Sequence, residues 1–564
     1  MKIFTIILII IPILTACAAT PEMPGGSSPT EYKPAGKISE SAYAKYMYGV
    51  FLRKEGRKGE AIKNLEEASR FDTTSESIRA ELLGLYLETG QKRKAEEAAK
   101  EIISINPDNP DAHISIGRIL ADRKELGRAA THFEKAIELV PDKAGPYIYL
   151  AEIYGMTGKT RPALKILKNL AKKPEHASLA YFYMARLYAR TGKTNMAVDH
   201  LEKAIKLKSS FLSAVSDLGK IYEEQGEKAE AIKLYRLFLE KNPEKSSVRE
   251  LLAHLLMREG KYDDAKAEIE MILDDSPSNT NAMLMLGLVE AQRGETGRAL
   301  EIFTEVKKRM SGNLEVILQT GNLQRELKLY EDALITYQEA ATLAPNRYEP
   351  YLNLAVTYDM MEDNKKALDN LGKALELEPE RIPIRTFMSQ ILVQMERYGE
   401  AEDTLRVGLE KAPQSIPLLY QLGIALDKDG RFEMTEELML KIIELDPDHF
   451  DALNYLGYSW AERDKNLAEA LTMIEKALKI KPDAPYIIDS LGWIYYKLER
   501  YEEALGQLLK AYESMKEDPT VLEHLGDVYL KLGDGGSARK YWNLVLNHDP
   551  GNERVIKKLK DLDQ

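Results

Sequence analysis

The stretch 451–483, DALNYLGYSWAERDKNLAEALTMIEKALKIKPD, contains the pattern that decides the fold. Apolar residues recur every three or four positions in both of its halves, which predicts two amphipathic helices. A polar turn at residues 464–466 separates the two halves. Gly457 lies in the middle of the first helix, where glycine costs about 1 kcal/mol relative to alanine, so close packing against the second helix must offset that cost. Pro482 ends the second helix because it has no backbone N–H. The stretch is therefore predicted to form a helical hairpin.

This hairpin pattern repeats along the chain. A small residue recurs every 34 positions without a slip, at Gly117, Ala151, Ala185, Gly219, Ala253, Gly287, Gly321, Ala355, Ser389, Gly423 and Gly457. Alanine recurs in the same register twelve positions further on, from Ala129 to Ala401. Further small residues outside the strict register, at Gly49, Gly84, Gly492 and Gly526, bring the number of units to fifteen. Because one hairpin cannot bury its own apolar face, neighbouring hairpins are expected to stack into a solenoid.

A unit of 34 residues with Leu-Gly in its first helix, alanine in its second and proline at its end resembles the tetratricopeptide repeat (TPR). The resemblance covers about nine-tenths of the chain. It implies an all-α fold, a right-handed TPR superhelix of about fifteen helical hairpins. Residues 38–551 are predicted as the solenoid and residues 552–564 as a capping helix. That helix, NERVIKKLKDLDQ, is expected to turn Val555, Ile556, Leu559 and Leu562 inward.

The first 17 residues, MKIFTIILIIIPILTAC, read as an export signal. A basic residue precedes an apolar run that is too short to be a permanent membrane span. The run ends in Leu-Thr-Ala-Cys and resembles the lipobox of bacterial lipoproteins. The resemblance implies that residues 1–16 are removed and that Cys17 carries a diacylglycerol and an acyl chain such as palmitate. Residues 17–37 are rich in Pro, Gly and Ser and are predicted to be a flexible spacer.

The residue after the cysteine gives an expectation for localisation. Ala18 resembles the outer-membrane sorting signal of bacteria with two membranes. The resemblance implies a lipid-anchored protein of the outer membrane that faces the periplasm, or of the cell membrane in a host with one membrane.

Composition and motifs exclude several other functions. One cysteine in 564 residues excludes a disulfide framework and a zinc ribbon, and a net charge of -12 disfavours nucleic acid as a partner. The string GMTGKT at residues 155–160 lacks the first glycine of a phosphate-binding loop. The eight histidines show no metal-binding spacing. We therefore expect no enzyme, no metal and no cofactor apart from the lipid on Cys17.

The candidate binding residues lie in the last four units. In TPR proteins the first helices line a concave groove, through positions three before, one after and four after the small residue. In these units those positions hold Tyr420, Asn454, Tyr458, Asp489, Trp493, Tyr496, Glu523 and Asp527. Tyrosine and tryptophan offer large contact areas, and Asn and Asp can bond an extended peptide. Two interpretations remain open, a groove that binds peptides and aromatic packing between neighbouring helices.

The resemblance implies a membrane-anchored scaffold that binds other proteins or peptides in the bacterial envelope. Such a scaffold would assemble an envelope, secretion, pilus or polysaccharide-export machine. The alternative is a glycan-binding accessory of a polysaccharide-export system, because aromatic side chains also stack on sugar rings.

Overall fold

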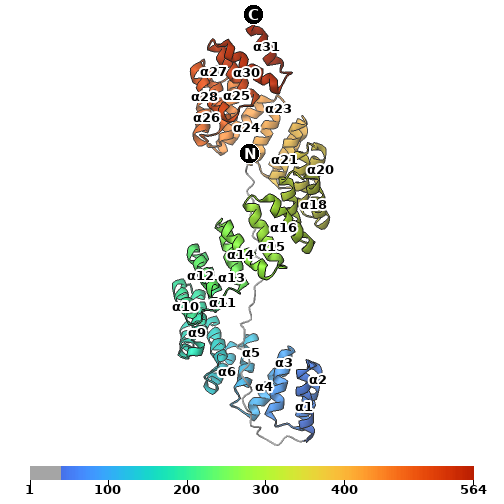
Figure 1. The fold of residues 1–564 in the computed structure, drawn as a ribbon, viewed down its shortest axis with the longest axis vertical. Helices are drawn as coiled ribbons and strands as arrows, with labels where there is room; N and C mark the ends of the chain where they lie inside the picture. The colour runs from blue at the N-terminus through green and yellow to red at the C-terminus, as the bar shows by residue number, and fades with distance from the viewer. Residues whose placement is uncertain (1–39, 564) are drawn as a thin grey trace. The chain divides into compact units, whose positions relative to one another are not determined.

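The computed structural model describes residues 40–563, so the predicted signal peptide, Cys17 and the predicted spacer lie outside the described residues. The described chain forms 31 α-helices and contains no β-strand (Figure 1). The helices fall into two compact units that divide after Glu259.

The first unit contains α1 (Glu40–Lys54), α2 (Lys58–Phe71), α3 (Glu76–Glu88), α4 (Lys92–Ile105), α5 (Pro110–Asp122), α6 (Leu126–Leu139), α7 (Ala144–Met156), α8 (Thr160–Ala171), α9 (Pro174–Arg190), α10 (Thr194–Leu207), α11 (Leu212–Glu224), α12 (Lys228–Lys241) and α13 (Ser246–Arg258).

The second unit contains α14 (Tyr262–Asp275), α15 (Thr280–Gln292), α16 (Thr296–Arg309), α17 (Leu314–Glu326), α18 (Tyr330–Leu343), α19 (Tyr348–Met360), α20 (Asn364–Leu377), α21 (Ile382–Gln394), α22 (Tyr398–Lys411), α23 (Ile416–Lys428), α24 (Phe432–Leu445), α25 (Phe450–Glu462), α26 (Leu467–Ile480), α27 (Pro485–Lys497), α28 (Tyr501–Ser514), α29 (Pro519–Lys531), α30 (Gly535–His548) and α31 (Glu553–Leu562).

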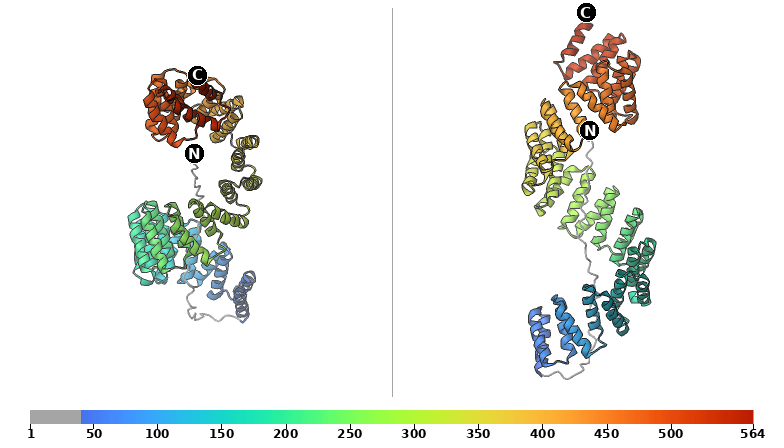
Figure 2. Two further views of the ribbon diagram at one scale, coloured as in Figure 1. Left: turned by 45° about the horizontal axis from the view of Figure 1, so that its top comes forward. Right: turned by 180° about the vertical axis from the view of Figure 1, so that it is seen from behind.

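Within each unit, consecutive helices pack as hairpins, and each hairpin stacks on its neighbour in sequence (Figure 2). Apart from the last helix, α31, an odd-numbered helix is the first helix of its hairpin. A turn of three residues joins it to the second helix, except between α25 and α26, where the turn has four. The middle residue of this turn adopts a left-handed backbone, as at Gly158 with φ of 73°. Lys124 occupies the same turn position with φ of 64°. Glycine suits this conformation because it has no Cβ. The string GMTGKT is thus an inter-helix turn.

In most first helices with glycine at the small position, this glycine faces a large side chain of the second helix. A Cβ on Gly117 would lie 2.8 Å from Phe133, and a Cβ on Gly457 would lie 2.7 Å from Ile474. Wherever the residue sixteen positions downstream is aromatic, the small position is glycine. The aromatic residues are Phe133, Tyr235, Phe303, Tyr337 and Trp542, each facing a glycine. Ring size thus selects glycine over alanine, because interiors are close-packed.

The last helix, α31, packs on the end of the second unit. Asn552 caps it by accepting a hydrogen bond from the backbone N–H of Val555. Val555 is fully buried, and Leu559 and Leu562 pack against the same cluster as Trp542. Ile556, which the sequence also predicted to face inward, is half-buried and is not part of that cluster.

The fold prediction is confirmed. The described residues give an all-α solenoid with the number of helices expected for fifteen hairpins and one capping helix. Apolar clusters span neighbouring hairpins within each unit, as stacking of amphipathic hairpins requires.

Candidate functional site

The predicted binding residues lie on the first helices of the last four hairpins. Tyr420 is on α23, Asn454 and Tyr458 are on α25, and the others are on α27 and α29. α25 contacts α27 more extensively than α26 contacts α28, so the first helices lie on the inner side of the stack. We call this surface the C-terminal inner face, which comprises Tyr420, Asn454, Tyr458, Asp489, Trp493, Tyr496, Glu523 and Asp527.

Trp493 lies in a stack of three rings. Its ring centroid is 4.0 Å from that of His524 and 4.7 Å from that of Tyr496, with interplanar angles of 13° and 11°. At these distances the rings of His524 and Tyr496 could not both fit on the same face of the Trp493 indole. They therefore cover its two opposite faces. Trp493 is 8% exposed. Its ring therefore packs between α27 and α29, and only its edge is available for other contacts.

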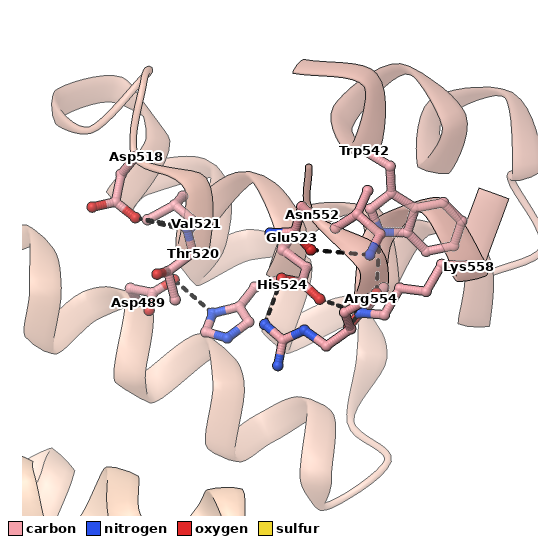
Figure 3. Close-up of polar contacts among 12 residues, drawn as sticks. Asp489, Asp518, Thr520, Val521, Glu523, His524, Trp542, Asn552, Arg554 and Lys558 are labelled. Carbon is pink, nitrogen blue, oxygen red and sulfur yellow. Dashed lines mark hydrogen bonds and ion pairs between the residues drawn. The ribbon is translucent and has the colours of Figure 1, made fainter. Parts of the chain in front are cut away.

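Asp489 and His524 form a buried pair beside this stack (Figure 3). Their Oδ1 and Nδ1 atoms are 3.0 Å apart. The hydrogen bond supplies a partner for a carboxyl that could not otherwise be buried at low cost. The sequence did not predict His524 as a site residue, because it lies two positions before its small residue and outside the three expected positions. Its separation from Asp489, 35 residues, places it one hairpin later on the neighbouring first helix.

Glu523 is paired with Arg554 and Lys558 of α31 (Figure 3), and Asp527 is paired with Lys558. Lys558 Nζ donates to Glu523 Oε1 at 2.6 Å and to both oxygens of Asp527 at 2.6 and 2.5 Å. Arg554 donates to Glu523 Oε2 at 2.5 Å, and the indole N–H of Trp542 donates to Asp527 Oδ1 at 3.1 Å. The two carboxylates therefore already have partners from within the chain.

The pKa values of these two acids move in opposite directions. Burial raises the pKa of Asp527, and Lys558 opposes the rise only in part. Burial also tends to raise the pKa of Glu523, but hydrogen bonds from Lys558 and Arg554 outweigh it and lower the pKa. Both shifts follow from the balance between desolvation and a nearby cation.

Two buried polar atoms of the C-terminal inner face have no hydrogen-bond partner in the described chain. They are the amide oxygen of Asn454 and the indole nitrogen of Trp493, on the neighbouring helices α25 and α27. Both residues are about nine-tenths buried. An unpaired buried polar atom costs about 1–3 kcal/mol, so a hydrogen-bond partner for either atom would be stabilising.

Two tyrosines of this face are half-buried and remain in contact with solvent. Tyr458 lies with its ring 6.2 Å from that of His524, and Tyr420 packs edge-on against Tyr455 at 6.3 Å. Burial raises the pKa of Tyr420 to about 12, so its phenol is neutral at physiological pH. Both side chains can offer a neutral hydroxyl and an apolar ring edge to a bound segment.

The first unit contains a separate cavity between α9 and α11. It has a volume of about 330 Å³ and is lined by Arg186, Arg190, Asp217, Lys220 and Glu224 among others. Burial raises the pKa of Asp217 despite the nearby Arg186 and Lys220. The lining mixes both signs of charge, so it does not select one class of ligand.

Between residues 40 and 563, no helix combines the length and apolarity needed to cross a bilayer. The same range holds no group of three or more His, Cys, Asp or Glu side chains placed to bind a metal ion.

Models of the tetratricopeptide repeat match six segments that together span more than half of the chain. The matched segments are residues 52–119, 182–246, 251–313, 360–423, 420–485 and 490–553. The chain belongs to the tetratricopeptide repeat family. The TPR resemblance of the sequence is thereby confirmed, and a TPR solenoid is a scaffold for protein–protein interaction.

Individual relatives are similar to parts of this TPR chain. The TPR repeat-containing protein PA4667 of Pseudomonas aeruginosa is 36% identical over 85 residues, which cover 15% of this chain and 14% of that protein. Human tetratricopeptide repeat protein 6 is 26% identical over 151 residues, or 27% of this chain and 29% of that protein. The chain thus spans less than a third of either relative.

Two solved structures also resemble the chain. A tetratricopeptide repeat protein from Parabacteroides merdae has a TM-score of 0.38 and 19% identity, covering 44% of this chain and 98% of its own. Yeast Tom70 has a TM-score of 0.35 and 18% identity, covering 86% of this chain and 99% of its own.

Proposed function

We propose that this TPR protein is a lipid-anchored adaptor of the bacterial envelope that binds an extended polypeptide segment on its C-terminal inner face. Cys17 would carry the lipid anchor, and residues 17–37 would separate the repeats from the membrane. Binding rather than catalysis would be its role, as part of a machine for envelope assembly, secretion, pilus formation or polysaccharide export.

The single observation that carries the binding proposal is the pair of unpaired polar atoms on α25 and α27. The Asn454 amide oxygen can accept a hydrogen bond, and the Trp493 indole N–H can donate one. A peptide backbone in extended form presents both an N–H and a C=O at each residue, so it can satisfy both atoms. Tyr458 lies on the same face and would add apolar contact.

The glycan alternative has less support. A sugar ring binds to the open face of an aromatic ring, but His524 and Tyr496 stack on Trp493 at 4.0 and 4.7 Å. Trp493 therefore offers an edge and not a face. The polypeptide proposal, in contrast, includes a hydrogen-bond acceptor for the unpaired indole N–H of Trp493.

The binding proposal is tested by photo-crosslinking in cells. A photoreactive phenylalanine derivative at Tyr458 would form adducts with a defined protein, and the same derivative at Ile335 would serve as the matched control. Ile335 is 70% exposed on α18, away from the C-terminal inner face. Identical adducts from both positions would contradict a partner site at Tyr458.

The anchoring proposal is tested separately by fractionation. Acyl chains contribute about 0.8 kcal/mol per buried CH₂, and stable anchoring requires more than one chain. Cys17→Ser should therefore move the protein from the membrane to the soluble fraction, whereas Ala18→Ser should leave it in the membrane. A Cys17→Ser protein that stays in the membrane fraction would refute anchoring through that residue.

A further inference from the structure

Two second helices of the first unit, α8 and α10, lie in a strongly basic part of an acidic chain. Residues 158–211 contain twelve Lys and Arg but only three Asp and Glu, whereas the whole chain contains 78 and 90. This segment therefore has a net charge opposite in sign to that of the chain that contains it.

The basic side chains are exposed and gather on one face of each helix. In α8 they follow one another at spacings of four, three and four residues, which makes them neighbours on the helix surface. In α10 two lysines are three residues apart. We call this set the basic face, which comprises Arg161, Lys165, Lys168, Lys172, Lys203 and Lys206.

His200 of α10 shows that the two parts of the basic face adjoin. Burial lowers the pKa of this histidine, and Lys203 of α10 and Lys168 of α8 both act in the same direction. Since a charge must be near an imidazole to shift its pKa, the two lysines lie close to His200 from two different helices.

No cation of the basic face forms an ion pair with a carboxylate of residues 40–563. Lys173, next in sequence to Lys172, is paired with Asp142 instead. Of the acids on α10, Glu202 accepts a hydrogen bond from the hydroxyl of Tyr222 at 3.1 Å. Like charges at these helical spacings repel each other, so an external anion would stabilise the basic face.

The repeat does not require basic residues at these positions. Three repeats after α8, the helix α14 has the same four positions of its own repeat on its surface. They hold Asp263, Ala267, Glu270 and Asp274. The basic stripe of α8 is therefore a property of this hairpin and not of the family.

We propose that the basic face binds the surface of a membrane that contains anionic phospholipids. α7 contacts α9 more extensively than α8 contacts α10, so the second helices lie on the outer side of the first unit, where a broad surface can reach them. Each Lys or Arg near an anionic membrane surface strengthens binding about fivefold.

The kinds of side chain favour a lipid surface over an acidic protein. Five of the six cations are lysines, whose ammonium groups act as point charges on flexible stems. Paired recognition of a protein carboxylate relies more often on the planar guanidinium of arginine. Leu207, which follows Lys206, is 57% exposed and would enter the headgroup layer, as apolar side chains do in surface-bound helices.

Fluorescence quenching at the membrane surface tests the contact. The chain has one cysteine, so the full chain with Cys17→Ser can carry one dye on a new thiol at Asn169→Cys, an exposed position of α8. Vesicles of phosphatidylglycerol and phosphatidylcholine with spin-labelled headgroups should quench this dye, and vesicles without phosphatidylglycerol should not. The same dye at Ile335→Cys on α18 is the control and should stay bright. Equal quenching at both positions, or in both kinds of vesicle, would overturn the proposal.

Charge reversal tests which cations are responsible. Reversing three lysines of α8 to glutamate should lower the affinity for the anionic vesicles about a hundredfold, since each contributes about fivefold. A control with the same net charge reverses three exposed lysines scattered over the second unit. Equal affinities of the two variants would overturn the proposal. Circular dichroism and thermal midpoints check the folding of both. The first variant is Lys165→Glu, Lys168→Glu and Lys172→Glu, and the control is Lys365→Glu, Lys479→Glu and Lys510→Glu.

Salt dependence tests the same contact without any change to the basic face. Raising the ionic strength from about 0.1 to about 1 M shortens the screening length from about 10 to about 3 Å, so quenching at Asn169→Cys should be lost. Quenching that persists would overturn the electrostatic contact.

A protein partner on this face would give a different result. If anionic vesicles never quench the dye, and a photo-crosslinker at Asn169 captures a protein in cells that the reversal of α8 releases, the proposal is wrong. The inference depends on neither the lipid anchor nor the C-terminal inner face, because Cys17→Ser chains carry no lipid and the dye lies on α8.

Discussion

The two ends of the described solenoid differ in how their apolar faces are covered. A stack of hairpins exposes an apolar face at each end unless something polar on its outer side covers it. At the carboxyl end, α31 provides this cover, with Val555 buried and Lys558 paired to Glu523 and Asp527. At the amino end, α1 leaves Phe51 and its neighbours exposed. The repeat therefore determines the middle of a solenoid, whereas each end depends on residues outside the repeat.

The helix that covers the carboxyl end, α31, also matches the charges of the helix beneath it. Glu523 is 3% exposed, and such a carboxylate is tolerated only with a cation beside it. Lys558 and Arg554 supply that cation from α31. The apolar contacts hold α31 in place, and the ion pairs fix its register on α29.

Removal of α31 should lower the free energy of unfolding more than any other change considered below. Deleting residues 552–564 exposes the site of Val555 and leaves Glu523 and Asp527 without their cations. Breaking a buried ion pair by removing one partner costs about 3–5 kcal/mol. Urea unfolding should show a loss of this size, and hydrogen exchange should accelerate in α29 and α30. Unchanged exchange in both helices would contradict the capping role.

Adding a methyl group at the small position should destabilise the last hairpin more than the first. Gly526→Ala brings a Cβ into the Trp542 ring, which Asp527 holds by a hydrogen bond. Overpacking of this kind costs about 1–3 kcal/mol. Gly49→Ala meets the flexible Leu65 side chain at 2.7 Å, and the gain of about 1 kcal/mol in helix propensity offsets the crowding. Thermal unfolding of both variants measures the difference, and equal losses would contradict it.

Lys558→Met should make stability depend on pH. Burial already raises the pKa of Asp527, and removing Lys558 raises that pKa further. The folded protein then binds a proton more readily than the unfolded chain, so lowering the pH favours folding. We expect a loss of about 1–3 kcal/mol at pH 7 that shrinks towards pH 4. Lys557→Met, on the exposed side of α31, is the control and should show neither effect.

Phe51→Glu should have the smallest effect on stability. The side chain is exposed on α1, and substitutions at such positions change the free energy of unfolding by about 0.5 kcal/mol or less. The measurement is urea unfolding. A loss of about 2 kcal/mol or more, the size expected for a buried contact, would show that the chain itself covers this face.

The repeat pattern predicted the fold because every unit carries the same information. The 34-residue register located the first helices, and the glycines at positions such as Gly117 and Gly457 marked the close approach of the second helices. The register also placed the candidate residues correctly on the first helices of the last hairpins. It could do so because helical periodicity fixes which face a residue occupies.

The partners of those residues could not be predicted in the same way. His524 lies off the expected positions, yet it pairs with Asp489 and stacks on Trp493. Lys558 and Arg554 lie beyond the last repeat, so the register gave no reason to place them on Asp527 and Glu523. Periodicity indicates the face of a helix, but the side chain that fills the space opposite depends on packing with the neighbouring helix.

Asn454→Leu tests most directly whether the C-terminal inner face binds a partner. The substitution removes an unpaired buried polar group and keeps a similar volume. We predict that the free energy of unfolding stays the same or rises by about 1 kcal/mol, and that photo-crosslinks from Tyr458 to the partner are lost. A variant that is destabilised and still forms the same crosslinks would contradict the account, because Asn454 would then serve the fold and not the partner.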